Sequence, residues 1–174
     1  MSKAEHYWDA NWCARDFFCG TADAHQVFYW TFGWLSRWLP LAELAWCGRV
    51  LTWGLLAWAW QRLSWSLVPV PLLGVLTAAI WVALNDRCAM AGEWLIGGVE
   101  AKGFAYVLVL LGLESLVRGR WTAMWLLFGA ASSFHVIIGG WSVVAGLVVW
   151  LASSDRPSWP RTLAALGCGL LLAA

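Results

Sequence analysis

Long apolar runs, separated by short polar breaks, fill the sequence from residue 44 to its end. A helix formed by such a run is apolar on every side, which is typical of helices within a lipid bilayer. Several runs are shorter than the roughly 20 residues that cross a bilayer comfortably, so we expect short or partly re-entrant spans. The expected spans are residues 44–60, 67–84, 103–117 (beginning earlier, in the preceding polar stretch), 121–140, 141–152 and 162–174.

The composition agrees with this interpretation and excludes an ordinary water-soluble domain. The chain is 61% hydrophobic and 12% charged, whereas soluble domains are about 45–50% apolar and about 25% charged. Its 17 tryptophans suit a membrane protein, because indole favours the headgroup level of a bilayer. A net charge of +1 provides no basic surface for nucleic acid. We therefore expect an all-α, polytopic membrane bundle of about five to six short spans.

The first part of the chain differs from the rest. Residues 1–26 are polar, and residues 27–39 are rich in aromatic side chains at near-helical spacing, which favours a helix lying at the membrane surface. The sequence thus predicts an extracytoplasmic loop with an interfacial amphipathic helix over residues 1–43 and a transmembrane bundle over residues 44–174. Because the sequence stops inside an apolar run, we expect it to be an N-terminal portion of a longer protein.

The charges of the connections indicate an orientation. The connections at 61–66, 118–120 and 153–161 hold five arginines and a single acid, Asp155. The other side receives residues 1–43, the stretch 85–102 and an expected glycine turn at residues 139–140. By the positive-inside rule, the arginine side is cytoplasmic and the acidic side extracytoplasmic, in the cell (inner) membrane.

The polar stretch 85–102 is a candidate binding site. Asp86, Glu93 and Glu100 are spaced seven residues apart, which would align them on one helix face. Lys102 is expected to bind an anion such as a lipid phosphate, while Glu100 orients it or accepts a proton. Two residues apart on a helix, they would not face each other, so each needs another partner. The alternative is structural: an acid paired with an arginine, and Lys102 reaching to the headgroups.

The N-terminal loop WDANWCARDFF carries Asp9, Arg15 and Asp16. A carboxylate here could act as a general base or hold a divalent cation, and the alternative is a solvated loop without a function. His135, in SSFHVIIGGWS, is expected on the same side, where the alternative is a hydrogen-bonded core histidine. No zinc-protease, P-loop or glycine-rich nucleotide motif is present, so we assign no metal ligands and leave the cofactor unknown.

Two charges within the apolar runs call for partners in the bundle. Arg49 needs an internal partner such as Glu43 or an outer acid. Glu114 is expected to pair with Arg118, four residues further along the same helix.

The layout resembles the GT-C class of membrane glycosyltransferases, which use polyprenyl-phosphate-linked sugar donors. The resemblance is carried by the WDANWCARDFF loop, the aromatic segment VFYWTFGWLSRWL, and the run GGVEAKGFAYVLVLLGLESLVRGRW followed by LLFGAASSFHVIIGGW. It covers most of the chain but has low motif specificity. The sequence departs from the class because no span precedes the loop and the loop has no Asp-Asp or Asp-Glu pair.

The resemblance implies an inverting sugar transfer on the extracytoplasmic side, with membrane lipids and a polyprenyl-phosphate sugar donor as partners. It implies Asp16, or else Asp9, as the catalytic acid, with a divalent cation as a candidate cofactor. The expected lipid-phosphate-binding residues are Lys102, Glu100, Glu93, His135 and Arg15. Two alternatives remain open: a transporter or flippase-like protein, and a non-catalytic membrane subunit.

Overall fold

Helices and connecting loops make up the part of the chain that can be described, which in this computed structural model comprises residues 2–21, 25–87 and 98–171. Four short helices lie at the N-terminus: α1 (Ser2–Trp8), α2 (Phe17–Gly20), α3 (Gln26–Thr31) and the 3-10 helix η1 (Gly33–Arg37). Six longer helices follow: α4 (Leu41–Leu67), α5 (Leu73–Arg87), α6 (Ala101–Val117), α7 (Trp121–Phe134), α8 (Val136–Ala152) and α9 (Trp159–Leu170). The predicted all-α class is confirmed for these residues, which contain no strand.

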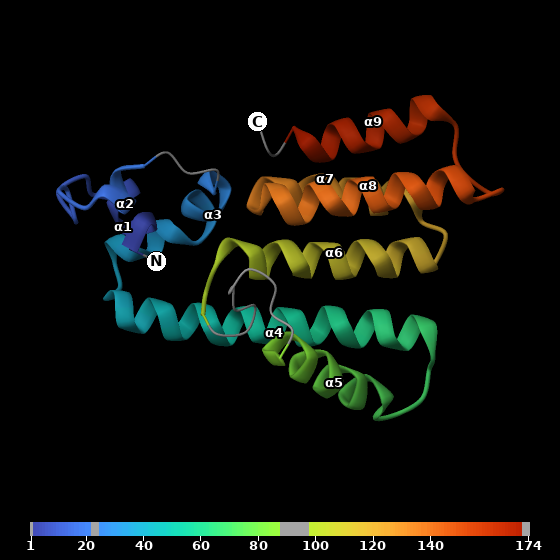
Figure 1. Cartoon of the computed structure of the whole chain (residues 1–174), viewed down its shortest axis with the longest axis horizontal. Helices are drawn as coiled ribbons and strands as arrows, with labels where there is room; N and C mark the ends of the chain where they lie inside the picture. The colour runs from blue at the N-terminus through green and yellow to red at the C-terminus, as the bar shows by residue number, and fades with distance from the viewer. Residues whose placement is uncertain (1, 22–24, 88–97, 172–174) are drawn as a thin grey trace.

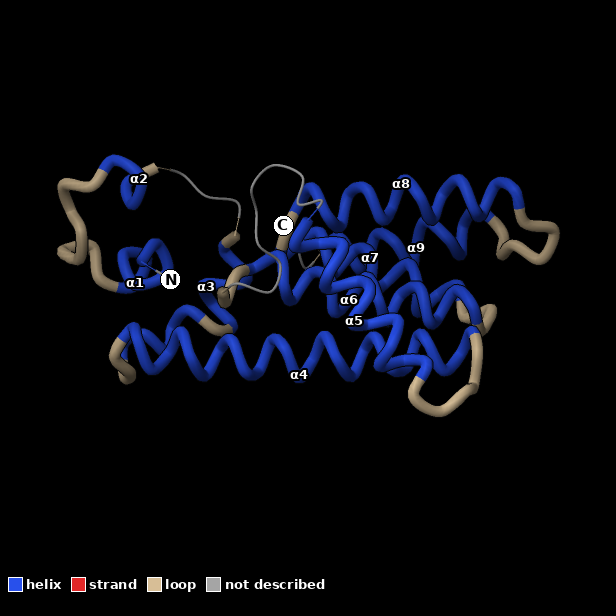
Figure 2. The backbone as a smooth tube through the Cα atoms, turned by 60° about the horizontal axis from the view of Figure 1, so that its bottom comes forward, coloured by secondary structure: helices blue, strands red, loops and turns tan. Residues whose placement is uncertain are grey.

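The six longer helices run side by side, and successive helices are antiparallel (Figure 1). The packing order is α5, α4, α6, α7 and α9, with α8 against α7 and α6. The connections therefore lie at the two ends of the bundle (Figure 2). At one end, α1, α2, α3 and η1 form a small cap, which contacts α4 through η1 and α7 through α3.

The cap and the bundle share a hydrophobic core. Phe28, Tyr29 and Phe32 of the cap are buried against Leu44 of α4 and Ala101 of α6. The predicted boundary after residue 43 therefore lies inside the first turn of α4, and the same core continues across it. Two further cores lie between helices of the bundle, one formed by α7, α8 and α9 and the other by α4 and α6.

Three predicted boundaries differ from the structure. The aromatic segment 27–39 forms two short helices, α3 and η1, instead of one. Residues 61–66 belong to α4, and the following helix begins only after the two prolines at 69 and 71, which cannot donate a backbone hydrogen bond within a helix. The expected turn at residues 139–140 is helical, and the chain reverses at His135, between α7 and α8.

Gly139 has a different role from the predicted one. A Cβ atom at this position would overlap the backbone of Ser132 on the neighbouring helix α7. The missing side chain therefore allows α7 and α8 to approach closely. Gly129 of α7 and Gly169 of α9 are in similar contact, so small residues mediate both of these helix pairs.

A buried carboxylate links α4 and α6 at the end of the bundle opposite the cap. Glu114 pairs with Arg118 at 2.8 Å between Nε and Oε1, which confirms the expected pair. Arg62 and Arg120 bind the same carboxylate at 3.0 and 3.3 Å. Arg49 lies over the rings of Trp46 and Trp53, with its Cζ 4.6 and 5.9 Å from the ring centroids, and it forms no ion pair with an acid among the described residues.

Within the described residues, no helix has both the length and the apolar character that crossing a membrane requires.

Candidate functional site at the cap

A cavity of about 280 Å³ lies where the cap meets the bundle. The cap contributes α1, α2, α3 and His25 to its wall, and the bundle contributes the start of α6 and the turn between α7 and α8. Its lining residues are Ser2, Lys3, Ala4, Phe18, His25, Phe28, Tyr29, Val99, Glu100, Ala101, Lys102 and His135. Three expected site residues, Glu100, Lys102 and His135, therefore meet at one cavity, together with Lys3 and His25.

Lys102 lies in the first turn of α6, and its side chain is only 5% exposed. Its Nζ atom is 3.5 Å from Oε2 of Glu100, whose side chain is largely exposed. The expectation that these two side chains could not face each other is therefore wrong. Glu100 precedes the helix and has an extended backbone, with φ −142° and ψ 156°, so the spacing rule for helical residues does not apply to it.

His135 and His25 come from distant parts of the sequence and stack on each other. Their ring centroids are 5.1 Å apart and the rings are inclined by 30°. Nδ1 of His25 lies 2.9 Å from the carbonyl oxygen of Phe134, and because a carbonyl only accepts, this nitrogen carries the proton. Nδ1 of His135 instead accepts a hydrogen bond from the backbone N–H of Ile138 at 3.4 Å, so in the neutral ring Nε2 carries the proton.

The charges around the cavity favour an anionic ligand. Lys3 and Lys102 line it together with two imidazoles, whereas Glu100 is the carboxylate among the lining residues. Lys3 also lies over the ring of Phe18, with its Nζ 4.7 Å from the ring centroid. Two ammonium groups and the Nε2–H of neutral His135 around a small cavity can bind a phosphate group through charge-assisted hydrogen bonds.

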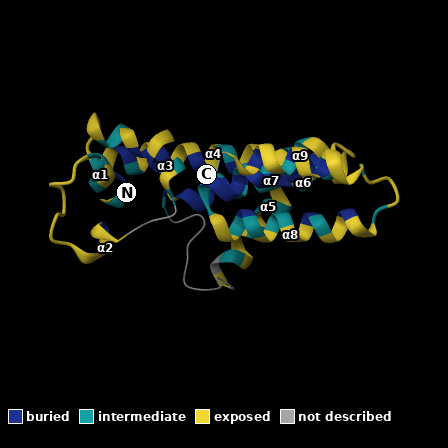
Figure 3. Cartoon of the chain, turned by 90° about the horizontal axis from the view of Figure 1, so that it is seen from above, coloured by how far each residue is buried: buried dark blue, intermediate teal, exposed yellow. Residues whose placement is uncertain are grey.

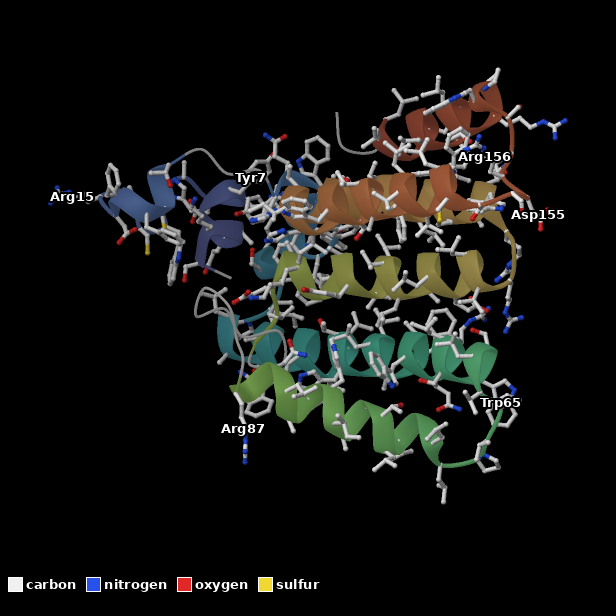
Figure 4. All side chains as sticks on the ribbon, turned by 45° about the vertical axis from the view of Figure 1, so that its right-hand side comes forward. Tyr7, Arg15, Trp65, Arg87, Asp155 and Arg156 are labelled. Atoms are coloured by element: carbon white, nitrogen blue, oxygen red, sulfur yellow. The ribbon has the colours of Figure 1, made fainter. Side chains whose placement is uncertain are left out.

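The predicted acidic loop lies outside this lining. Oδ1 of Asp9 accepts the backbone N–H of Asn11 at 3.0 Å, and both residues are exposed. Oδ1 of Asp16 caps α2 by accepting the N–H of Cys19 at 2.9 Å. Arg15 is exposed and points away from the bundle at the tip of the loop (Figure 4). Glu93 lies outside the described residues, as does the side chain of Asp86.

Two groups in the cap have altered acid–base properties. Burial, and to a lesser degree the negative charge of Asp9, raises the pKa of the Glu5 carboxyl above its ordinary value. Burial, followed by the nearby Asp16 and Cys13, raises the pKa of the Cys19 thiol. Both Cys13 and Cys19 are free thiols. Neither Glu5 nor Cys19 lines the cavity.

Sequence reasoning did not assign His25 or Lys3 to the site. Both lie in the polar N-terminal segment, and no spacing relates either of them to α6 or α7. The signal that could have found His25 is its position two residues before the aromatic segment 27–39, at the end of the polar N-terminal segment. Among the described residues, no group of three or more histidine, cysteine or acidic side chains could hold a metal ion.

No protein-family model, no curated protein and no solved structure matches the chain.

Proposed function

We propose that this chain belongs to a multi-pass membrane glycosyltransferase similar to the GT-C class, and that the cavity at the cap binds the phosphate of a lipid-linked sugar donor. The observation that carries the proposal is the gathering of Lys102, Lys3, His25 and His135 around one small cavity. In this proposal the cap end faces the extracytoplasmic side, and the arginine end faces the cytoplasm.

The outer surface of the bundle supports a membrane location. Large apolar side chains are exposed along α4, α5 and α8, where water would be an unfavourable neighbour. Figure 3 shows this exposure in yellow along the outer faces of α4 and α8. Examples are Trp46, Val50, Trp58, Val75, Ile80, Val144 and Val148. Lipid tails would cover such faces without a cost, because they are themselves apolar.

The inner contacts support the same location. Gly139 of α8 meets the backbone of Ser132, and Gly129 of α7 meets the backbone of Gly169. Close backbone approach at small residues is a common way for helices to pack in a bilayer, where hydrophobic burial between helices provides little driving force. The ionic groups Glu100, Lys102 and Glu114 lie near the ends of α6, where charged side chains can reach the headgroup region of a bilayer.

The cavity provides the groups that the transfer needs. Lys102 is buried, so its charge acts on a bound phosphate at a lower effective dielectric constant than in water. The reaction forms a bond between the acceptor oxygen and the anomeric carbon while the bond from that carbon to the phosphate oxygen breaks. Lys102 and the Nε2–H donor of His135 then stabilise the negative charge that develops on the leaving phosphate.

A carboxylate has to receive the proton of the acceptor hydroxyl. Glu100 is the described carboxylate at the cavity, and its exposure leaves it accessible to an acceptor from the aqueous side. We therefore assign the base to Glu100 in this proposal. Asp16, the acid implied by the resemblance, caps α2, whose Phe18 lines the cavity. Asp16 and Asp9 remain candidates for the base, and direct substitution distinguishes the three.

The experiment measures binding and transfer separately. Farnesyl phosphate, a short polyprenyl monophosphate, is titrated into the detergent-purified chain and into a Lys102→Met variant. A charge-assisted hydrogen bond contributes about 1.5–3 kcal/mol, so we expect the variant to bind roughly 10- to 100-fold more weakly. Arg37→Gln, which removes an exposed charge on η1, is the matched control. Equal binding by wild type and Lys102→Met would exclude this phosphate site.

Transfer of a labelled sugar from a polyprenyl-phosphate donor tests the catalytic half of the proposal in membranes. Loss of transfer in Lys102→Met with retained transfer in Arg37→Gln is the expected result. Binding of farnesyl phosphate without any sugar transfer from a panel of donors would contradict the glycosyltransferase proposal and favour a transporter or a non-catalytic lipid-binding subunit.

A further inference from the structure

We infer that the end of the bundle opposite the cap contains a second site, which binds the phosphate of an anionic phospholipid headgroup. The site is formed by Arg62, Arg118 and Arg120, and Glu114 holds the three guanidinium groups together. It does not depend on the cavity at the cap or on a catalytic function.

Glu114 is fixed in a buried position, with a side chain only 2% exposed. Its Oε1 atom contacts Nη2 of Arg62 at 3.0 Å and Nε of Arg118 at 2.8 Å. Its Oε2 atom contacts Nη2 of Arg120 at 3.3 Å. Three side chains from α4 and from the connection between α6 and α7 therefore converge on one carboxylate.

The charges of this cluster do not balance. Three guanidinium groups and one carboxylate leave a surplus of two positive charges. The arginine side chains are 39%, 46% and 49% exposed, so the charge surplus faces outward while the carboxylate stays inside.

The arginines also have donors to spare. Each guanidinium has five N–H donors in a planar fork, and the contacts to Glu114 use the Nε and Nη2 atoms of Arg62, Nε of Arg118 and Nη2 of Arg120. This geometry suits the oxygens of a phosphate, which arginine binds through paired hydrogen bonds. Because Glu114 already holds the three guanidinium groups in place, the arginine side chains lose little conformational entropy when a phosphate binds.

The neighbouring side chains favour a lipid over a free phosphate ion. Trp58 lies beside Arg62, with the guanidinium carbon 5.3 Å from its ring centroid, and its indole is exposed. Trp65 is exposed on the same end of α4 (Figure 4), and Val117 is exposed at the end of α6. Exposed indole and aliphatic groups next to a phosphate-binding cluster match the boundary between headgroup and acyl chains.

The test compares lipid binding with thermal stability in the detergent-purified full chain. Fluorescent phosphatidylglycerol and phosphatidylcholine are titrated separately, because only the first has a net negative charge. We expect tighter binding of phosphatidylglycerol, weakened roughly fivefold by Arg118→Gln and by Arg120→Gln. Arg37→Gln, which removes one exposed charge at the cap end, should leave this binding unchanged.

Glu114→Gln distinguishes a lipid-binding site from a cluster of ion pairs that only stabilises the fold. It removes the compensating negative charge, so it should lower the melting temperature and yet preserve or strengthen phosphatidylglycerol binding. Equal affinity for the two lipids, or binding that falls with stability in all three variants, would overturn the inference. Competition by inorganic phosphate at the same concentration as the lipid would also overturn it, because the ligand would then be a free anion.

Discussion

His25 and His135 stack at the junction of cap and bundle, with their ring centroids 5.1 Å apart. Each ring is held through its Nδ1 atom by the backbone around the α7–α8 turn: His25 donates to the carbonyl of Phe134, and His135 accepts from the N–H of Ile138. This pair joins the N-terminal segment to the bundle and forms part of the cavity wall. The same residues therefore serve the fold and the proposed binding of phosphate.

His135 performs two tasks that substitution can separate. It is the N-cap of α8, a position that asparagine also fills well. We expect His135→Leu to lower the free energy of unfolding by about 1 kcal/mol, because the cap is lost, and His135→Asn to lower it by less. Both variants should bind farnesyl phosphate several-fold more weakly, because both lack the imidazole. Chemical denaturation and ligand titration measure the two effects. Unchanged phosphate binding in both variants would exclude His135 from the site.

The proposed base is tested by neutralising each candidate carboxylate in turn. Glu100→Gln should lower the rate of sugar transfer by a factor of 100 or more, on the order of the 10²–10⁴ that a general base contributes, with little change in phosphate binding. Asp9→Asn and Asp16→Asn should retain most of the activity, since neither residue lines the cavity. If Asp16→Asn lost sugar transfer while Glu100→Gln kept full activity, the general base would be Asp16, as the resemblance implies.

Two adjacent glycines in α8 provide a matched test of helix packing. A Cβ at Gly139 would overlap the backbone of Ser132, whereas a Cβ at Gly140 would meet nothing within 4 Å. We expect Gly139→Ala to destabilise the fold by about 1–3 kcal/mol through overpacking. Gly140→Ala should be neutral or stabilising by up to about 1 kcal/mol, because alanine favours the helix. Melting temperatures of the two variants give the comparison, and equal destabilisation would contradict the close approach of α7 and α8.

The sequence predicts several helices well because an apolar run without an internal break becomes one helix, whereas the expected span 121–140 is divided between α7 and α8. Residues 103–117, for example, lie within α6, and residues 141–152 lie within α8. The glycine pair at 139–140 misled the prediction, since glycine indicates a turn in local sequence but can also allow two helices to touch. Only the position of Ser132 distinguishes these roles, and it depends on the tertiary structure.

The site could be predicted only in part, for a similar reason. Glu100, Lys102 and His135 were expected on one side because the helices alternate in direction, and this places them at the same end of the bundle. Lys3 and His25 reach the cavity through the folding of the cap, which rests on aromatic contacts such as Phe28 with Phe104 and Phe32 with Phe104. No sequence spacing encodes those long-range contacts.

Glu5 gives the cap a predictable dependence on pH. Its Oε2 atom is buried and has no hydrogen-bond partner within the described residues, and burial followed by the charge of Asp9 raises its pKa. The folded state therefore binds this proton more tightly than the unfolded state does. The resulting stability is fully present below the pKa of the unfolded chain, and it is lost as the pH rises through the higher pKa of the folded state.

Glu5→Gln should remove this dependence, since glutamine stays neutral. At pH 7 we expect the variant to be slightly more stable than the wild type, because glutamine has no charge whose desolvation opposes folding. At a pH below the ordinary pKa of glutamate, the two proteins should have similar stability. Melting curves at both pH values provide the measurement. If the wild type instead gained stability relative to Glu5→Gln as the pH rises, the folded cap would favour the ionised form of Glu5. The pKa of Glu5 would then be lowered by folding, which would contradict the direction that its burial gives.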